Sequence, residues 1–199
     1  MLVIGTGAIG LLACALLRAS GCSDLSAIDI EAASGKLDFA IRAELADRTA
    51  TLANPSPPPA DDPQTVLRGK ATADRLLSEL AHPSGFDVVI ECTGFGEPIQ
   101  TAVHACRTGG KVLLIGMGTP QVNFPLGSAA LREIDVVGVF RYANTYPAAL
   151  ALLASGKMGS IGSIITHRFK LEDARKAFEL MKAGRDSEGK ALIKAVIES

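Results

Sequence analysis

Three glycines close to the N-terminus, Gly5, Gly7 and Gly10, are spaced as Gly-x-Gly-x-x-Gly. The apolar residues 2–4 before them are typical of a short buried strand, and the apolar run 11–17 after them is typical of a helix. A strand, glycine turn and helix in this order form a binding site for the pyrophosphate of a dinucleotide. The first glycine permits the tight turn, the second lets the backbone approach the phosphates, and the third lets the helix pack closely on the sheet. The N–H groups at the helix N-terminus attract the phosphate charge.

A carboxylate stands where the second part of such a site is expected. Asp29 closes the next apolar strand, residues 25–29, and follows Gly10 by 19 residues. In dinucleotide-binding folds an acidic residue at this place accepts a hydrogen bond from the adenosine ribose 2′-hydroxyl. Because a carboxylate repels a 2′-phosphate, Asp29 favours NAD over NADP. The alternative is a glycine-rich turn that binds nothing.

Bulk properties narrow the classes of function. The chain of 199 residues has a formal net charge of −1 and no run of basic residues, which argues against a nucleic-acid partner. Its apolar content of 48% suits a sheet that is buried on both faces. The cysteines lie far apart without a Cys-x-x-Cys pair, so neither a zinc site nor a disulfide framework is predicted. They are expected to be reduced, small buried groups: Cys14, Cys22, Cys92 and Cys106.

The N-terminal apolar run permits a second interpretation. The first 17 residues carry no charged side chain, and residues 13–15, Ala-Cys-Ala, resemble a signal-peptidase site. No lysine or arginine precedes the run, however, and three glycines interrupt it where a nucleotide turn needs them. The run is also too short and too rich in glycine to span a membrane. We therefore expect a cytoplasmic protein without a membrane partner.

Strands and helices alternate along the chain, which predicts an α/β protein with a Rossmann-type, doubly wound parallel sheet of six strands. The prolines within residues 54–63 exclude a helix or a central strand, so a surface loop is expected there. The expected strands are residues 2–4, 25–29, 48–52, 86–91, 111–118 and 135–140, and the expected later helices are residues 31–45, 65–80, 98–105, 128–132 and 147–155.

The C-terminal segment differs from the rest of the chain. A strand at residues 164–169, a helix at 171–183 and a strand at 190–198 predict a strand-helix-strand tail. We therefore divide the chain into a Rossmann domain, residues 1–157, and a tail, residues 158–199.

A few other residues carry groups that could do chemistry. Glu91 at a strand end could act as an acid or base. No histidine or second carboxylate adjoins it in sequence, so a structural or coenzyme-orienting role is favoured. The histidines, His82, His104 and His167, stand apart and are expected on the surface or in packing rather than around a metal.

Four segments carry a resemblance to a known family: residues 3–10, VIGTGAIG; residues 90–94, IECTG; residues 138–147, GVFRYANTYP; and residues 165–169, ITHRF. The chain resembles the C-terminal half of the zinc-dependent medium-chain dehydrogenases. It is most similar to their polyol branch, the sorbitol, xylitol and L-arabinitol dehydrogenases. The resemblance implies an oxidoreductase that transfers hydride from a secondary alcohol to NAD.

The resemblance assigns roles to residues at matching positions. It places Asp29 on the adenosine ribose with Lys36 as a basic residue nearby, although a two-residue insertion between positions 32 and 35 blurs the match at Lys36. It places Arg141 and Tyr142 against the polyol hydroxyls. Together with the glycine turn, the other residues expected to contact NAD are Gly5, Gly7, Ala8, Ile9, Gly10, Thr93, Ile115, Gly116, Met117, Val139, Phe140 and Arg141.

In the resembled family, a catalytic domain precedes the glycine turn and supplies the zinc ligands and most of the substrate pocket. No catalytic residue and no zinc ligand is therefore expected in the present sequence. The family's tail packs against that domain, so Phe178 and Met181, with Ile193 and Val196, are expected to be partly uncovered. Members of the family usually form homo-oligomers, so a second copy or a partner that covers the tail is expected.

Three interpretations remain open from the sequence. The chain is the NAD-binding half of a polyol dehydrogenase, a non-catalytic module that binds NAD(H) or a partner, or a structural relic that binds nothing. The residues that face substrate in the family, Arg141 and Tyr142, favour the first. The missing zinc domain favours the second.

Overall fold

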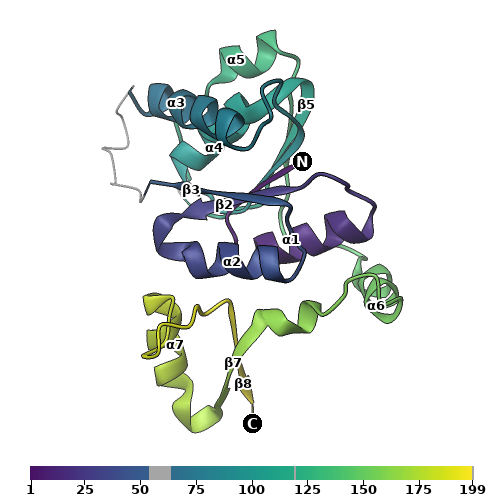
Figure 1. Ribbon diagram of the computed structural model, residues 1–199, viewed down its shortest axis with the longest axis vertical. Helices are drawn as coiled ribbons and strands as arrows, with labels where there is room; N and C mark the ends of the chain where they lie inside the picture. The colour runs from purple at the N-terminus through teal and green to yellow at the C-terminus, as the bar shows by residue number, and fades with distance from the viewer. Residues whose placement is uncertain (54–63, 119, 199) are drawn as a thin grey trace.

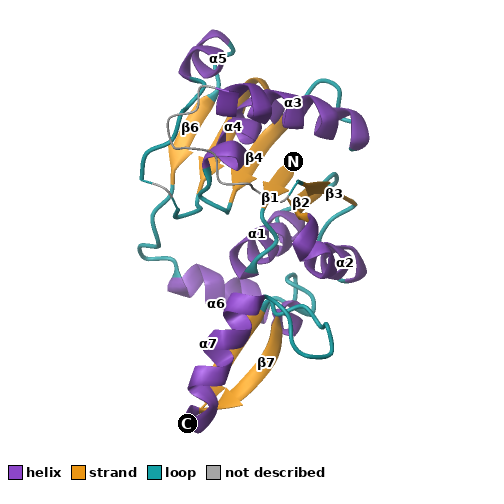
Figure 2. Ribbon diagram, turned by 90° about the vertical axis from the view of Figure 1, so that its left-hand side faces the viewer, coloured by secondary structure: helices purple, strands orange, loops and turns teal. Residues whose placement is uncertain are grey.

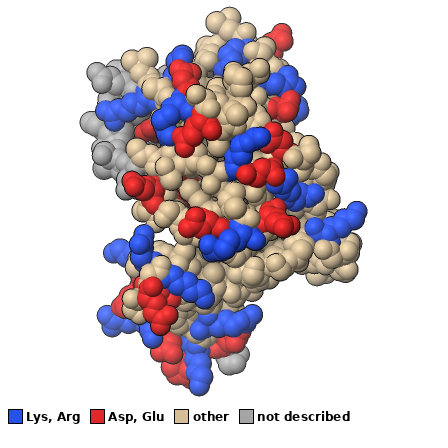
Figure 3. All heavy atoms as spheres, viewed as in Figure 1, with Lys and Arg blue, Asp and Glu red and all other residues tan. Residues whose placement is uncertain are grey.

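The computed structural model describes residues 1–53, 64–118 and 120–198, so the surface loop expected at residues 54–63 lies outside the described residues. Within the described part, no helix is long and apolar enough to cross a membrane. Lysine, arginine, aspartate and glutamate side chains are interspersed over the face shown in Figure 3.

Six parallel strands form the central sheet, in the order β3-β2-β1-β4-β5-β6, and Figure 2 shows β3 and β6 on its two sides. This order confirms the predicted Rossmann-type sheet. Because the order reverses between β1 and β4, a crevice opens at the C-terminal ends of these strands, where open α/β sheets bind ligands. The strands are β1 (Leu2–Ile4), β2 (Ser26–Ile30), β3 (Arg48–Leu52), β4 (Phe86–Glu91), β5 (Cys106–Leu114) and β6 (Asp135–Gly138).

Helices cover both faces of the sheet, so β1 contributes to two cores (Figures 1 and 2). Helices α1 (Ala8–Ala19) and α2 (Ser34–Arg42) pack on one face, and α3 (Gln64–Glu79), α4 (Gly96–Ala105) and α5 (Leu126–Leu131) pack on the other. Successive strand residues point to opposite faces. Val3 therefore joins the core under α1, while Leu2 and Ile4 join the core under α3 and α4.

Strand β5 and the helix expected at residues 31–45 differ from the sequence-based expectation. Strand β5 begins at Cys106 rather than at residue 111, because Gly109 and Gly110 form an irregularity inside the strand instead of ending the preceding helix. Gly109 has a φ of +69°, and the pairing with β4 shifts register at this point, as in a β-bulge. The helix expected at residues 31–45 is a 3₁₀ helix (Glu31–Ala33) followed by the shorter α2.

The C-terminal segment forms its own small unit. After α6 (Tyr146–Ala154) and a 3₁₀ helix (Ile161–Ile164), the parallel strands β7 (Ile165–Lys170) and β8 (Lys194–Glu198) flank α7 (Ala174–Ala183). This confirms the strand-helix-strand tail.

Strand β8 is shorter than the expected residues 190–198 because a turn precedes it. In this turn the Asp186 carboxylate accepts hydrogen bonds from the N–H groups of Glu188 and Lys190, at 3.0 and 2.8 Å. A bridge between Arg185 and Ala191 closes the turn.

The tail contributes two isoleucines to the core on the α1 and α2 face of the sheet. Ile164 and Ile193 are buried, 5% and 9% exposed, in the same core as Leu11 of α1. The expectation of an uncovered Ile193 is therefore wrong, because this side chain is buried in the core on the α1 and α2 face of the sheet. Phe178 and Met181 are 65% and 52% exposed, as expected. The division of the chain at residue 157 stays a prediction.

Candidate functional site

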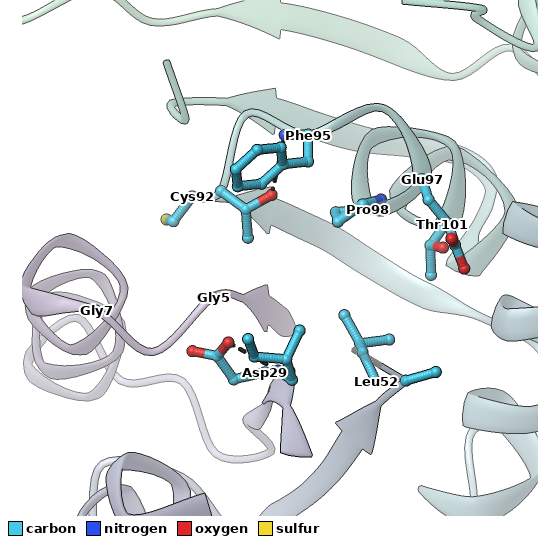
Figure 4. A pocket seen from close by; sticks show the side chains of 12 residues that line it. Gly5, Gly7, Asp29, Leu52, Cys92, Phe95, Glu97, Pro98 and Thr101 are labelled. Carbon is cyan, nitrogen blue, oxygen red and sulfur yellow. Dashed lines mark hydrogen bonds between the residues drawn. The ribbon is translucent and has the colours of Figure 1, made fainter. Parts of the chain in front are cut away.

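A cavity of about 220 Å³ opens at the C-terminal ends of the central strands (Figure 4). Four of the residues predicted to bind NAD line it: Gly5, Gly7, Asp29 and Thr93. Sequence reasoning did not assign the others, which are Ile30, Leu52, Ala53, Cys92, Phe95, Glu97, Pro98 and Thr101. The sequence could have indicated part of this set, because the first turn of the helix that follows β4 must border the crevice.

The glycine turn shows why small residues are needed there. Gly5 has a φ of +94°, a conformation that L side chains rarely adopt. A Cβ added at Gly10 would lie 1.7 Å from the carbonyl oxygen of Gly5. A Cβ added at Gly7 meets no atom within 4 Å. Gly10 therefore serves the packing of α1, whereas Gly7 keeps the space beside the N-terminus of α1 open.

Asp29 is held in a fixed position beside this turn. One carboxylate oxygen accepts hydrogen bonds from the backbone N–H and the hydroxyl of Thr6, at 2.6 and 2.7 Å. The other accepts the N–H of Ile30 at 2.8 Å. A carboxylate has about four acceptor sites, so capacity remains for hydroxyl donors of a ligand.

Glu91 organises the turn that forms the opposite wall. Its side chain is fully buried and accepts hydrogen bonds from the N–H groups of Thr93 and Gly94, at 2.7 and 3.0 Å, and from the Thr93 hydroxyl. Burial raises the pKa of the Glu91 carboxyl above its usual range, and these hydrogen bonds partly oppose the rise. The geometry supports a structural role for Glu91, since it shapes the wall without lining the cavity.

The pKa of Glu91 leads to a pH-dependent prediction. A carboxyl whose pKa is higher in the folded than in the unfolded chain binds its proton more tightly when folded, so its ionisation lowers the free energy of unfolding as the pH rises above about 4.5. Glu91→Gln removes that ionisation. We expect urea unfolding between pH 5 and 8 to show the wild type losing stability relative to Glu91→Gln as the pH rises.

The control for this prediction is Glu172→Gln, on the exposed surface of the tail. Its difference from the wild type should stay nearly constant over the same pH range. A difference between Glu91→Gln and the wild type that does not change with pH contradicts the raised pKa.

The turns after β4 and β5 pack backbone against backbone. A Cβ at Gly116 would lie 2.0 Å from the Gly94 nitrogen, and one at Gly118 would lie 2.2 Å from the Gly94 oxygen. The N–H groups of Ile115 and Gly116 donate to the Glu91 carbonyl at 2.9 and 3.0 Å. The predicted segment Ile115-Gly116-Met117 thus lies beside the Thr93 turn, although it does not line the cavity.

The other predicted site residues lie outside this cavity. Ala8 and Ile9 are in the first turn of α1, and Ile9 is 55% exposed. Lys36 lines a second cavity of about 320 Å³ between α2 and the turn that precedes β8. The two cavities share Ile30.

The predicted substrate residues follow β6 on the surface. The Arg141 guanidinium lies over the Phe140 ring, 5.0 Å from its centroid, and Arg141 has a φ of +58°. The Tyr142 and Tyr146 hydroxyls are 3.2 Å apart. These residues and Val139 are exposed, and none of them lines the glycine-turn cavity.

The cysteines and histidines offer no metal site in the part of the chain that is described. Burial raises the pKa of Cys14 and Cys92 to about 12 and that of Cys106 to about 11, so these thiols are poor nucleophiles. Across residues 1–53, 64–118 and 120–198, no three His, Cys, Asp or Glu side chains are grouped to hold a metal ion. These residues therefore do not fit the zinc site of the resembled family.

The sheet order and the glycine turn at its switch point define a Rossmann domain of the dinucleotide-binding type. The sequence pattern of the zinc-binding dehydrogenases matches residues 8–155, and the chain belongs to this family.

Individual relatives agree with this assignment. Sorbitol dehydrogenase from Mus musculus is 36% identical over 186 residues, which cover 92% of this chain and 46% of the mouse protein. D-xylulose reductase A from Aspergillus niger is 35% identical over 186 residues, which cover 93% and 48% of the two chains. An alcohol dehydrogenase structure from Thermus sp. ATN1 superposes with a TM-score of 0.73 at 27% identity, covering 99% and 50%. The chain thus spans about half the length of these relatives.

Proposed function

We propose that this chain is the NAD-binding half of a polyol dehydrogenase of the sorbitol or xylitol type. The observation that carries the proposal is the Asp29 carboxylate, held by Thr6 beside the open space at Gly7. This arrangement fits a dinucleotide, because ribose hydroxyls can donate to Asp29 while the pyrophosphate lies along the backbone at Gly7. The identity to sorbitol dehydrogenases and xylulose reductases supports the substrate class.

In this proposal the residues of the chain bind and orient the coenzyme. The N-terminus of α1 attracts the pyrophosphate, and Asp29 holds the adenosine ribose. The turn fixed by Glu91 presents Thr93 toward the nicotinamide side of the crevice. Arg141 and Tyr142 contact the polyol hydroxyls. Bound NAD would supply the acceptor for the hydride of the alcohol carbon.

The experiment that tests the proposal is a fluorescence titration of the purified, folded chain with NADH and, in parallel, with NADPH. Saturable binding that prefers NADH supports it. Absence of binding by a chain with a cooperative unfolding transition overturns it, and also overturns the alternative of a module that only senses NAD(H).

A measurement of polyol oxidation distinguishes the NAD-binding half of a dehydrogenase from a non-catalytic module that binds NAD(H). In the resembled family the zinc and most of the substrate pocket belong to another domain, so we propose that the chain alone binds NADH without oxidising polyol. Adding a zinc-bearing catalytic half of a related polyol dehydrogenase should then restore oxidation of sorbitol or xylitol. Binding of NADH with no turnover under those conditions favours the non-catalytic module.

Exposed apolar side chains support a partner surface in this proposal. Along α1, Ile9, Leu12 and Leu16 are 55%, 37% and 49% exposed at a spacing that places them on one face of the helix. Phe178 and Met181 expose a second apolar face, on α7. Apolar surfaces of this kind mark contact sites with other protein parts. We assign both faces to contacts with the catalytic half of the enzyme.

Strand β6 supports a homo-oligomer. It forms an edge of the six-stranded sheet, and its side chains Val136 and Val137 are 41% and 42% exposed. Phe140, just beyond the strand, is 73% exposed. An open apolar edge strand can pair with another strand through its free N–H and C=O groups. We propose that β6 pairs with β6 of a second copy.

Self-association of the purified chain is therefore expected. Light scattering at increasing concentration should give a molar mass above the 20.6 kDa of one chain, with binding of a hydrophobic dye to the uncovered faces. Val137→Lys should lower the molar mass toward that of one chain, because it places a charge on the sheet edge. Thr108→Lys, on an exposed part of β5, is the matched control and should leave the molar mass unchanged. A monodisperse monomer that binds no dye contradicts the prediction.

A further inference from the structure

Two polar side chains line the far end of the cavity, away from the glycine turn and Asp29. Figure 4 shows Glu97 and Thr101, both from α4, at the opposite end of the cavity from Asp29. Thr101 has no exposed surface, and its hydroxyl oxygen has no hydrogen-bond partner among the described residues. A buried hydroxyl without a partner is costly and uncommon, so its place in a cavity wall points to a ligand group.

Glu97 supplies an acceptor beside this hydroxyl. It lies in the first turn of α4, and its Oε1 atom accepts a hydrogen bond from the hydroxyl of Thr72 on α3, at 3.2 Å. This bond holds the carboxylate in place and leaves further acceptor sites open. Because an ionised carboxylate only accepts hydrogen bonds, it selects a ligand edge that carries an N–H or O–H donor.

The walls between the two ends of the cavity are apolar. Leu52 at the end of β3 lies across the cavity from Pro98 on α4, as Figure 4 shows. Ile30 and Phe95 add further apolar surface, and 55% of Phe95 is exposed. The flat aromatic ring of a ligand would be shielded from water on both faces between these walls, and it could stack on the phenyl ring of Phe95.

We infer that Glu97 and Thr101 recognise the amino edge of adenine and so determine which purine dinucleotide the cavity accepts. This inference rests on the proposed function. The 6-amino group donates to the Glu97 carboxylate, and the Thr101 hydroxyl donates to a ring nitrogen. A 6-oxo purine instead turns a carbonyl oxygen toward the Glu97 carboxylate, and the two acceptors repel each other. The end of the cavity therefore rejects hypoxanthine.

The test compares NADH with reduced nicotinamide hypoxanthine dinucleotide, which carries oxygen in place of the amino group. We expect the wild type to bind NADH about tenfold more tightly. Glu97→Gln should reduce this ratio to about twofold, because the amide can also donate to the 6-oxo group. Thr101→Val should weaken NADH binding about tenfold, and Thr101→Ser should retain most of it. Asp38→Asn, an exposed acid on α2, should leave the ratio unchanged.

A second measurement separates recognition from a structural role. Without nucleotide, Thr101→Val should melt at the same temperature as the wild type or higher, because it removes a buried hydroxyl that has no partner. A lower melting temperature indicates a structural role and overturns the inference for Thr101. Equal binding of the two dinucleotides by the wild type, or an unchanged ratio in Glu97→Gln, overturns the inference while the proposed function stands. No binding of either dinucleotide by the folded wild type overturns both.

Discussion

Replacing Gly10 with alanine is expected to lower the free energy of unfolding by about 3 kcal/mol. The added Cβ would lie 1.7 Å from the oxygen and 2.9 Å from the carbonyl carbon of Gly5. Both are backbone atoms, which cannot rotate away as a side chain can, so α1 must move off β1. Because the two elements share a core with β2 and the tail, the loss affects the whole domain. Urea unfolding followed by circular dichroism measures it.

Gly7→Ala is the matched control, since it adds the same methyl group to the same turn but should cost less stability. A Cβ at Gly7 meets no atom within 4 Å, so stability should fall by about 1 kcal/mol or less. NADH binding should nevertheless weaken, because the methyl group occupies the space assigned to the pyrophosphate. Equal stability losses in the two variants would contradict the distinct roles of these glycines.

Asparagine in place of Asp29 is expected to weaken NADH binding by about 10- to 100-fold and to reduce the preference over NADPH. Hydrogen bonds to a charged acceptor contribute about 1.5–3 kcal/mol, and the amide retains only part of that. At the same time, removal of the negative charge removes its repulsion of a 2′-phosphate. The two effects change the affinity for NADPH in opposite directions. The ratio of the NADH affinity to the NADPH affinity is therefore the quantity to compare.

Parallel titrations of the wild type, Asp29→Asn and Asp38→Asn with both nucleotides give this ratio. Asp38 is an exposed acid on α2 that does not line the glycine-turn cavity, so its variant tests for a general effect of charge. An unchanged ratio in Asp29→Asn would show that Asp29 does not select the nucleotide. A thermal melt of each variant is needed, because Asp29 also accepts two hydrogen bonds from Thr6.

The sequence predicted those parts of the fold that depend on local pattern. Short segments rich in apolar residues marked most of the strands, and Gly5, Gly7 and Gly10 marked the turn that the structure places at the cavity. The strand order followed because alternating strands and helices build a parallel sheet with a limited set of topologies. The bulge at Gly109 was missed, because a glycine pair after a helix is equally typical of a helix end.

The far end of the cavity could not be predicted, since it depends on packing between distant elements. Leu52 of β3 and Thr101 of α4 line the same cavity although they are far apart in the sequence, and α4 packs there together with α3. The position of Glu97 depends on Thr72, which lies on the other helix. Likewise, Ile193 is buried in a core built from β1, α1 and α2, near the opposite end of the chain. No local periodicity encodes such contacts.

The backbone packing between the turns after β4 and β5 limits how a site of this design can diversify. Gly94, Gly116 and Gly118 lie behind the Thr93 side of the cavity and approach so closely that no side chain fits at any of them, so substitutions there disrupt the backbone packing that supports the cavity. Positions on α4 and at the ends of β2 and β3 present side chains to the cavity and can be exchanged while the wall stays intact. New nucleotide preferences in this scaffold must therefore arise by mutation at those side chains, while the packed glycines behind them stay unchanged.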